Sequence, residues 1–226
     1  MHRNGRDFIT LLKDEAYSSL KKLINEGKFK YGETYSLNTI ASELNMSRTP
    51  VRDAIQKLCN ENIIDLLPSR GFCLHTMTSE ETLQLYHFSS AIESYCASCL
   101  AKQYSKNPEN IYVEKLKNLL ERMKSCNLET AAFDEAYYHL DNSFHHTLIE
   151  SLEDTRFNML SESRFGFYDH PELHLTEVAL NKKVILSCHE LIVEAILAGD
   201  ADAAYRALLE HADIVYENYK KQASNK

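Results

Sequence analysis

Hydrophobic residues in the first third of the chain recur every three or four positions, which is the spacing of amphipathic helices. The pattern first holds from Asp7 to Glu26, and Gly27 is typical of a helix end. A second helix of about two turns follows, with its apolar positions at Leu37, Ile40, Ala41 and Leu44. After a turn at Asn45-Met46, a third helix begins at Ser47, and its buried side carries Val51, Ile55 and Leu58.

The pattern changes after Asn62. Residues 63–67 (IIDLL) are too few for a stable helix and predict a strand, and residues 72–75 (FCLH) predict a second one. Between them, PSRG at 68–71 is a turn signal. Three helices followed by a two-stranded ribbon are typical of a winged helix-turn-helix.

The remainder of the chain is predicted to be helical. Thr78-Ser79-Glu80-Glu81 combines a hydroxyl cap with acids, which is typical of a helix start. The linker before it is short, so we expect two domains, 1–76 and 79–222. The helices expected in the second domain span 79–105, 109–127, 129–152, 154–167, 174–198 and 201–222. The predicted fold class is mainly α, with an N-terminal winged helix-turn-helix and a C-terminal all-helical bundle.

Composition narrows the class of protein. The chain has 226 residues, 44% of them hydrophobic, and no apolar stretch of the about 18 residues that a transmembrane helix needs. No signal-peptide pattern follows Met1, so we expect a cytoplasmic protein without a membrane partner. The six cysteines are scattered, which favours reduced thiols. The pair Cys96 and Cys99 has no second CxxC downstream and indicates helix packing rather than a zinc site.

The net charge of −8 argues against nucleic-acid binding when the chain is taken whole. Residues 1–76, however, hold 11 Lys and Arg against 9 Asp and Glu, a net charge of +2. The rest holds 14 against 24, a net charge of −10. Only the first domain is therefore suited to face phosphates.

The third helix has the features of a DNA-reading helix. Ser47 can cap it by accepting hydrogen bonds from free backbone N–H groups, and Pro50 fits the first turn. Arg48, Thr49 and Arg52 are then available to the major groove of double-stranded DNA, where arginine reads guanine and threonine meets a phosphate or a thymine methyl. On charge and periodicity alone, a small helical bundle with two surface arginines remains an alternative.

The wing offers a second contact with DNA. Arg70 and Gly71 lie at the predicted wing tip, where a cation and an unhindered backbone can approach the neighbouring groove or phosphates.

The second domain contains a candidate metal site. Asp141 and His145 are four residues apart and share one face of a helix. His189 and His211 lie at equal distances from the turn at Gly199-Asp200, so an antiparallel helix pair places them at the same height. Three imidazoles and one carboxylate suit a divalent transition metal, namely Zn, Ni, Mn or Fe.

Other histidines are predicted to be bystanders or surface residues. His146 points about 100° away from its neighbour around the helix. His170 and His174 lie in a proline-containing segment. Histidines four residues apart are more often surface residues than ligands, so spacing alone leaves both interpretations of the cluster open.

The first domain resembles the GntR family of bacterial regulators. The segment LNTIASELNMSRTPVRDAIQKLCNENIIDLLPSRGF, residues 37–72, is similar to the family pattern of a two-helix turn, SRTPVREAL, a leucine-rich strand and a wing with a glycine. The resemblance implies DNA contacts at Arg48, Thr49, Arg52 and Gly71.

The second domain resembles the all-helical effector domain called FCD, found in the FadR subgroup of that family. The motifs are DNSFH at 141–145 and HELIVEAILAGDADAAYRALLEH at 189–211. The resemblance implies a metal held by Asp141, His145, His189 and His211.

In such relatives the metal and nearby polar residues hold a small organic acid, and many carry an arginine in the first effector helix. Ser89-Ser90 stands at that place here, which removes the usual cation. Arg164 and Tyr138 are our candidates for the effector pocket.

These features together predict a ligand-responsive transcription regulator rather than an enzyme. It would bind an inverted-repeat operator as a homodimer and sense a small organic acid, with repression as the commoner mode of the family. Two alternatives remain: a regulator whose metal site is structural or senses the metal itself, and a metal-dependent hydrolase.

Overall fold

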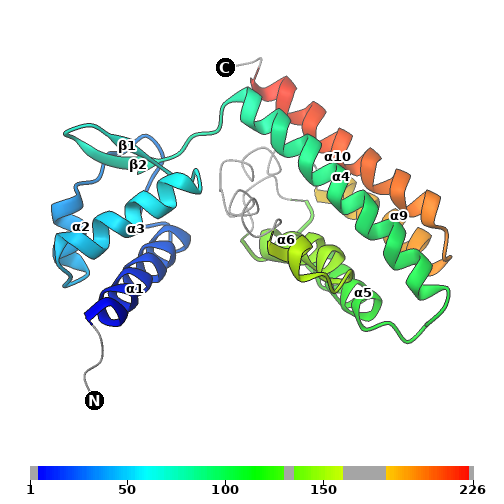
Figure 1. Ribbon diagram of the computed structural model, residues 1–226. Coiled ribbons are helices and arrows are strands. Elements are labelled where there is room, and N and C mark those ends of the chain that lie inside the picture. The colour runs from blue at the N-terminus through cyan, green and yellow to red at the C-terminus, as the bar shows by residue number, and fades with distance from the viewer. Residues whose placement is uncertain (1–4, 130–134, 160–181, 224–226) are drawn as a thin grey trace. The chain divides into compact units, whose positions relative to one another are not determined.

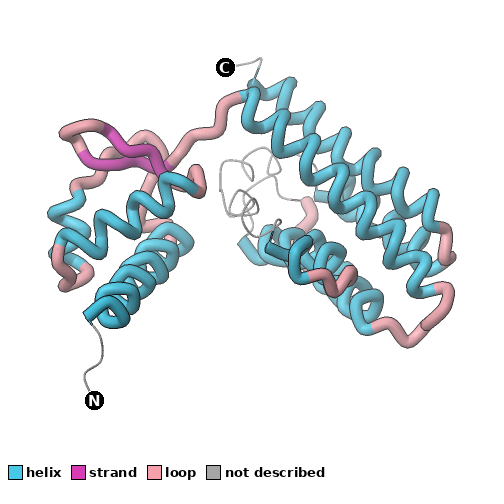
Figure 2. The backbone as a smooth tube through the Cα atoms, viewed as in Figure 1, coloured by secondary structure: helices cyan, strands magenta, loops and turns pink. Residues whose placement is uncertain are grey.

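The computed structural model describes residues 5–129, 135–159 and 182–223. These residues form two compact units, the first ending at Thr76 and the second starting at Met77. Helices dominate both units, and the strands described form one two-stranded sheet (Figures 1 and 2). The predicted mainly α fold class is confirmed.

The first unit is a small helical core with a β-hairpin. Its elements are α1 (Gly5–Asn25), α2 (Leu37–Glu43), α3 (Arg48–Asn60), β1 (Ile64–Leu67) and β2 (Gly71–Leu74). Helix α1 packs along α3, and α2 and β1 contact α3 from other sides. Leu20, Ile55, Leu58 and Phe72 are fully buried at the centre. The apolar faces of the helices therefore meet in one shared core.

The hairpin forms the wing, within one residue of its expected bounds. Its strands are antiparallel, with Ile64 opposite Leu74 and Leu67 opposite Gly71. The backbones of Tyr35 and Phe72 exchange hydrogen bonds of 2.7 and 3.0 Å. The segment before α2 therefore adds a third short edge to the sheet and fixes the wing on the core.

Helix α4 (Ser79–Tyr104) begins where the sequence predicts. The hydroxyl of Thr78 accepts a hydrogen bond from the Glu81 N–H at 3.2 Å, and the Glu81 carboxylate accepts one from the Thr78 N–H at 2.8 Å. This reciprocal capping box satisfies two backbone donors that a helix start leaves without partners. The capping sequence therefore defines the start of α4, five positions after the last residue of β2.

The other helices of the second unit surround a common core. They are α5 (Ile111–Lys124), α6 (Glu135–Glu150), α9 (Lys182–Leu197) and α10 (Ala201–Ala223). Helices α4 and α10 lie side by side (Figure 1), and both contact α9, while α5 packs against α6 and α9. Leu100, Leu116, Leu148, Ile192 and Leu208 are fully buried between them. None of the described helices is long and apolar enough to cross a membrane.

The connection between α5 and α6 differs from its prediction. Helix α5 ends at Lys124 rather than at 127, and Glu129, the predicted first residue of the next helix, lies in a turn. The Ser125 hydroxyl donates to the Arg122 carbonyl at 2.6 Å, and the Asn127 side chain accepts from the Glu129 N–H at 3.1 Å. Such short-range bonds compete with helical hydrogen bonding and end the helix early.

Candidate nucleic-acid interface and metal centre

Helix α3 has one buried face and one exposed face. The buried residues are Pro50, Val51, Ala54, Ile55 and Leu58. Arg48, Thr49 and Arg52 are exposed. Because the buried face fixes α3 on the core, the other face presents two guanidinium groups and a hydroxyl to the exterior. These groups can hydrogen-bond to base edges and phosphates in a major groove.

The structure lacks the side-chain cap that the sequence predicts at the start of α3. Ser47 occupies the N-cap position with φ −69° and ψ 159°, but its side chain makes no capping hydrogen bond. An N-cap side chain usually accepts from the second or third residue of the helix. The third residue is Pro50, which has no N–H to donate. The Ser47 side chain is exposed and directly precedes the predicted DNA contacts Arg48 and Thr49 in the sequence.

Gln56 extends the exposed face of α3, although it was not among the DNA contacts predicted from the sequence. It lies four residues after Arg52, is exposed, and donates a hydrogen bond to the Asn60 side chain at 3.3 Å. A glutamine amide can read adenine in the major groove. The signal in the sequence is its spacing, because Arg48, Arg52 and Gln56 follow one another at intervals of four residues and so share one face of the helix.

Arg70 lies in the turn between the two strands of the wing, and it is exposed. Gly71 follows with φ +124°, and a Cβ atom there would lie 2.0 Å from the Tyr35 carbonyl oxygen. The fold itself therefore requires a glycine at this position. The DNA contact expected at Gly71 stays a prediction, since packing explains why the residue lacks a side chain.

Three histidines from three helices meet in the core of the second unit. His145 of α6, His189 of α9 and His211 of α10 are 5%, 0% and 4% exposed. One ring nitrogen of each lies within 4.8 Å of the other two. The rings of His189 and His211 are 4.7 Å apart, as expected for positions at equal distances from the turn at Gly199-Asp200. Such a group can hold a metal ion.

Asp141 lies beside two of the three histidines. It is 2% exposed, one turn before His145 on α6. Its Oδ1 is 3.5 Å from His189 Nε2, and its Oδ2 is 3.9 Å from His145 Nε2. The carboxylate therefore faces the Nε2 atoms of both rings. The predicted fourth ligand, Asp141, lies beside the group of three histidines.

His189 has the protonation state that a metal ligand needs. Burial lowers its pKa well below the usual 6.5, and the neighbouring His211 and His145 lower it further. Its ring stacks on Phe144 with 4.2 Å between centroids, but neither ring nitrogen has a hydrogen-bond partner among the described residues. A buried polar atom without a partner is costly, and a neutral imidazole nitrogen is a good metal donor. The residues therefore fit a divalent transition metal.

Glu93 of α4 also belongs to the cluster, although the sequence patterns did not indicate it. It is 2% exposed, and its Oε2 lies 2.5 Å from His145 Nδ1. His145 thus has Glu93 at one ring nitrogen and Asp141 near the other. No local spacing links Glu93 to His145, because they are 52 positions apart on different helices. A single acid within the small and apolar stretch SSAIES was the only available signal.

The predicted effector residues stay predictions. Tyr138 is half-buried, with its ring centroid 5.0 Å from that of His139. Its neighbour Tyr137 is buried and donates a hydrogen bond to the Lys182 carbonyl at 3.2 Å. Outside the described residues lie Arg164, His170 and His174.

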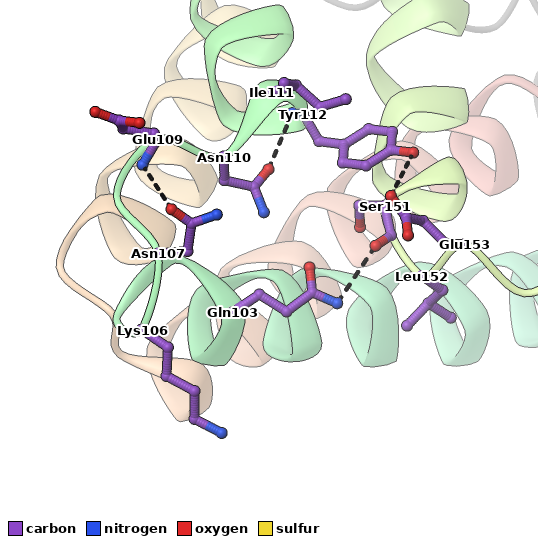
Figure 3. A pocket seen from close by; sticks show the side chains of 10 residues that line it. All are labelled: Gln103, Lys106, Asn107, Glu109, Asn110, Ile111, Tyr112, Ser151, Leu152 and Glu153. Carbon is purple, nitrogen blue, oxygen red and sulfur yellow. Dashed lines mark hydrogen bonds between the residues drawn. The ribbon is translucent and has the colours of Figure 1, made fainter.

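A separate surface pocket lies where the end of α4, the start of α5 and the end of α6 come together (Figure 3). Its volume is about 400 Å³, and polar side chains dominate its lining. Gln103 donates to the Ser151 carbonyl at 3.4 Å, and Asn110 caps α5 by accepting from the Tyr112 N–H at 2.9 Å. The pocket shares no residue with the histidine cluster. Its polar groups serve helix ends and turns.

A winged helix with an exposed cationic face, followed by a separate all-helical domain, is the arrangement of a DNA-binding transcription regulator, and this is the class of protein that the fold indicates. The family model for bacterial regulatory proteins of the gntR family matches residues 12–74, and the model for the FCD domain matches residues 84–213. The chain belongs to the GntR family of transcriptional regulators, with an FCD domain as its second unit.

Individual relatives agree with this assignment. The gluconate operon transcriptional repressor of Bacillus subtilis (strain 168) is 29% identical over 204 residues, which cover 88% of this chain and 81% of the relative. The solved structure of E. coli McbR/YncC has a TM-score of 0.67 at 21% identity and covers 92% of this chain and 98% of its own. A putative GntR regulator from Rhodococcus sp. RHA1 has a TM-score of 0.69 at 19% identity, with coverage of 91% and 95%.

At these identities the two structures establish the similarity of fold alone. The family and the relatives are transcriptional regulators rather than enzymes, which removes the hydrolase alternative.

Proposed function

We propose that the protein is a repressor of the FadR subgroup that binds an inverted-repeat operator as a homodimer and responds to a small organic acid bound at a metal-containing site. The observation that carries this proposal is the buried group of three histidines with a carboxylate beside it, in a domain joined to an exposed DNA-reading helix.

DNA recognition is supported by the exposed face of α3. Arg48 and Arg52 can each form paired hydrogen bonds to a guanine, Thr49 can contact a phosphate, and Arg70 of the wing can reach the backbone. A two-fold dimer would place two such helices in successive major grooves. The acidic second domain, with its net charge of −10 beyond Thr76, would stay away from the phosphates.

The metal centre would be held by His145, His189, His211 and Asp141. A divalent transition metal bound there would supply Lewis acidity that can polarise and orient a carboxylate. Neutral His189 is suited to donate a lone pair without losing a proton first, and Asp141 balances part of the positive charge.

The effector is expected to depend strongly on the metal for its binding. At the place where the resemblance predicts a cation, the Ser89 and Ser90 hydroxyls donate to the carbonyls of Leu85 and Tyr86 at 2.8 and 2.6 Å. These hydroxyls are directed back to the backbone of α4. The Bacillus subtilis relative is named for the gluconate operon, and gluconate is a hydroxylated carboxylic acid, which supports an acid of this kind. Arg164 and Tyr138 remain our proposed pocket residues.

A second candidate function is that the metal itself is the signal, or that it is structural. The observation in its favour is the deep burial of the three histidines, together with the lack of a cation at Ser89-Ser90.

DNA binding is tested by two substitutions on α3. Arg48→Ala and Arg52→Ala should each weaken binding to an operator fragment, selected from random duplexes, by about 5- to 150-fold, since a paired arginine–guanine contact is worth about 1–3 kcal/mol. Fluorescence anisotropy at fixed salt measures the affinity. Arg122→Ala, an exposed arginine of α5, is the matched control and should bind as the wild type does. Unchanged binding by both α3 variants would contradict the proposal.

The two signal hypotheses are separated by release of the operator. Gluconate and other small acids are added to the zinc-loaded complex, and a chelator is added to a parallel sample. Release by an acid while the zinc is retained supports acid sensing. Release by the chelator alone supports metal sensing, and release by neither indicates a structural metal.

A further inference from the structure

We propose that Glu93 is a positioning residue of the metal centre, which accepts a hydrogen bond from the Nδ1–H of His145 and so presents Nε2 of that ring to the metal. The inference rests on the proposed metal site and adds a residue from a helix that provides no ligand. It is carried by the contact of 2.5 Å between Glu93 Oε2 and His145 Nδ1.

Both members of this contact are buried, and they come from different helices, α4 and α6. At this distance the Glu93 carboxylate can accept a hydrogen bond from an Nδ1–H of His145, and the lone pair of Nε2 is then available to a metal. The bond offsets part of the cost of burying both polar groups. The bond therefore fixes both the orientation and the tautomer of the imidazole.

The opposite side of the ring faces the other ligands. His145 Nε2 lies 3.9 Å from Asp141 Oδ2, and the second oxygen of Asp141 lies 3.5 Å from His189 Nε2. The Asp141 carboxylate thus marks the side on which the ligand atoms converge. Glu93 lies across the His145 ring from that side, which is the place of an orienting carboxylate rather than of a ligand.

His189 has no comparable partner. Neither of its nitrogens is hydrogen-bonded among the described residues, and its ring is held by stacking on Phe144. The two histidines are therefore positioned by different means, one by a carboxylate and one by an aromatic face. The effect of Glu93 should act through His145 specifically.

The test measures zinc affinity of the full-length protein by competition with a chromophoric chelator. Glu93→Ala should weaken zinc binding by nearly 100-fold and Glu93→Gln by about 10-fold, because loss of an orienting partner typically costs about 10- to 100-fold in affinity and the amide oxygen still accepts a hydrogen bond. Glu194→Gln, an exposed acid of α9, is the matched control and should bind zinc as the wild type does. His189→Ala reports the loss of a true ligand.

The visible spectrum of the Co²⁺-loaded protein separates positioning from ligation. Glu93→Gln should keep the band pattern of the wild type, since the ligand set is unchanged, whereas a changed pattern would identify Glu93 as a ligand and overturn the inference. Wild-type zinc affinity in Glu93→Gln would overturn it as well, even where Glu93→Ala does not fold. A wild-type protein that binds no zinc would instead contradict the proposed metal centre and the inference together.

Discussion

At Gly71 the backbone of the wing leaves no space for a side chain. A Cβ atom would lie 2.0 Å from the Tyr35 carbonyl oxygen, and the φ of +124° is in a region that other residues avoid. Gly32 also has a positive φ, of +79°, but nothing lies within 4 Å of the place of its Cβ. Alanine at Gly71 would therefore meet both backbone strain and steric overlap, whereas alanine at Gly32 would meet backbone strain alone.

Gly71→Ala should lower the free energy of unfolding of the first unit by more than about 3 kcal/mol, because overlap adds to backbone strain of about 1–3 kcal/mol. Gly32→Ala should lower it by about 1 kcal/mol, from strain alone. Urea denaturation followed by circular dichroism measures both. Equal losses in the two variants would show that overlap with Tyr35 contributes nothing.

At the scale of secondary-structure elements, α3 and α4 each have a hydroxyl residue at the N-cap position, but only one of the two residues caps its helix. Thr78 caps α4 with reciprocal bonds to Glu81, whereas Ser47 occupies the same position before α3 without a capping bond. The difference follows from the third residue of each helix, which is Glu81 in α4 and Pro50 in α3.

Thr78→Ala should therefore destabilise the second unit by about 1 kcal/mol, the usual contribution of an N-cap side chain. Ser47→Ala should change stability by less than about 0.5 kcal/mol, as expected for an exposed side chain without a special contact. Hydrogen exchange at the first amides of each helix, together with urea denaturation, measures the pair. A loss of similar size in Ser47→Ala would contradict the account of Pro50.

The same elements show how much the sequence alone can predict. Helix α3, the wing and the start of α4 were predictable because each depends on local patterns: apolar periodicity, a turn signal and a capping box. The shared height of His189 and His211 was predictable because a single turn relates their helices.

The rest depends on contacts between distant segments or on competing local bonds. Glu93 and His145 meet only because α4 and α6 pack together. The requirement for Gly71 comes from Tyr35, whose backbone approaches it across the sheet edge. The early end of α5 reflects side-chain hydrogen bonds at Ser125 and Asn127 that periodicity does not reveal.

At the scale of the whole molecule, stability should depend on pH through the buried His189. Its pKa in the folded protein is well below 6.5, so the unfolded chain binds a proton there more readily. The stabilisation is therefore fully present above about pH 6.5 and is lost as the pH falls toward the folded pKa, with a slope of about 1.4 kcal/mol per pH unit from this residue.

Urea denaturation of the metal-free protein at pH 5.5, 6.5 and 7.5, in the presence of a chelator, measures this dependence. The unfolding free energy should fall by about 1 kcal/mol or more between pH 6.5 and 5.5. His189→Asn should show a smaller fall over the same interval. An identical pH profile in the variant would show that His189 is not the residue responsible.

The placement of the three histidines on α6, α9 and α10 also has a consequence for the lifetime of the protein. A metal that joins His145 to His211 links two points of the chain 66 positions apart, as a reversible cross-link. Because such a metal would bind the folded chain and not the unfolded one, it would stabilise the protein by mass action, more strongly as the metal concentration rises. A newly made chain that lacks metal would then unfold more often and be degraded faster. The cellular amount of such a regulator would follow the metal supply, whether or not its operator is occupied.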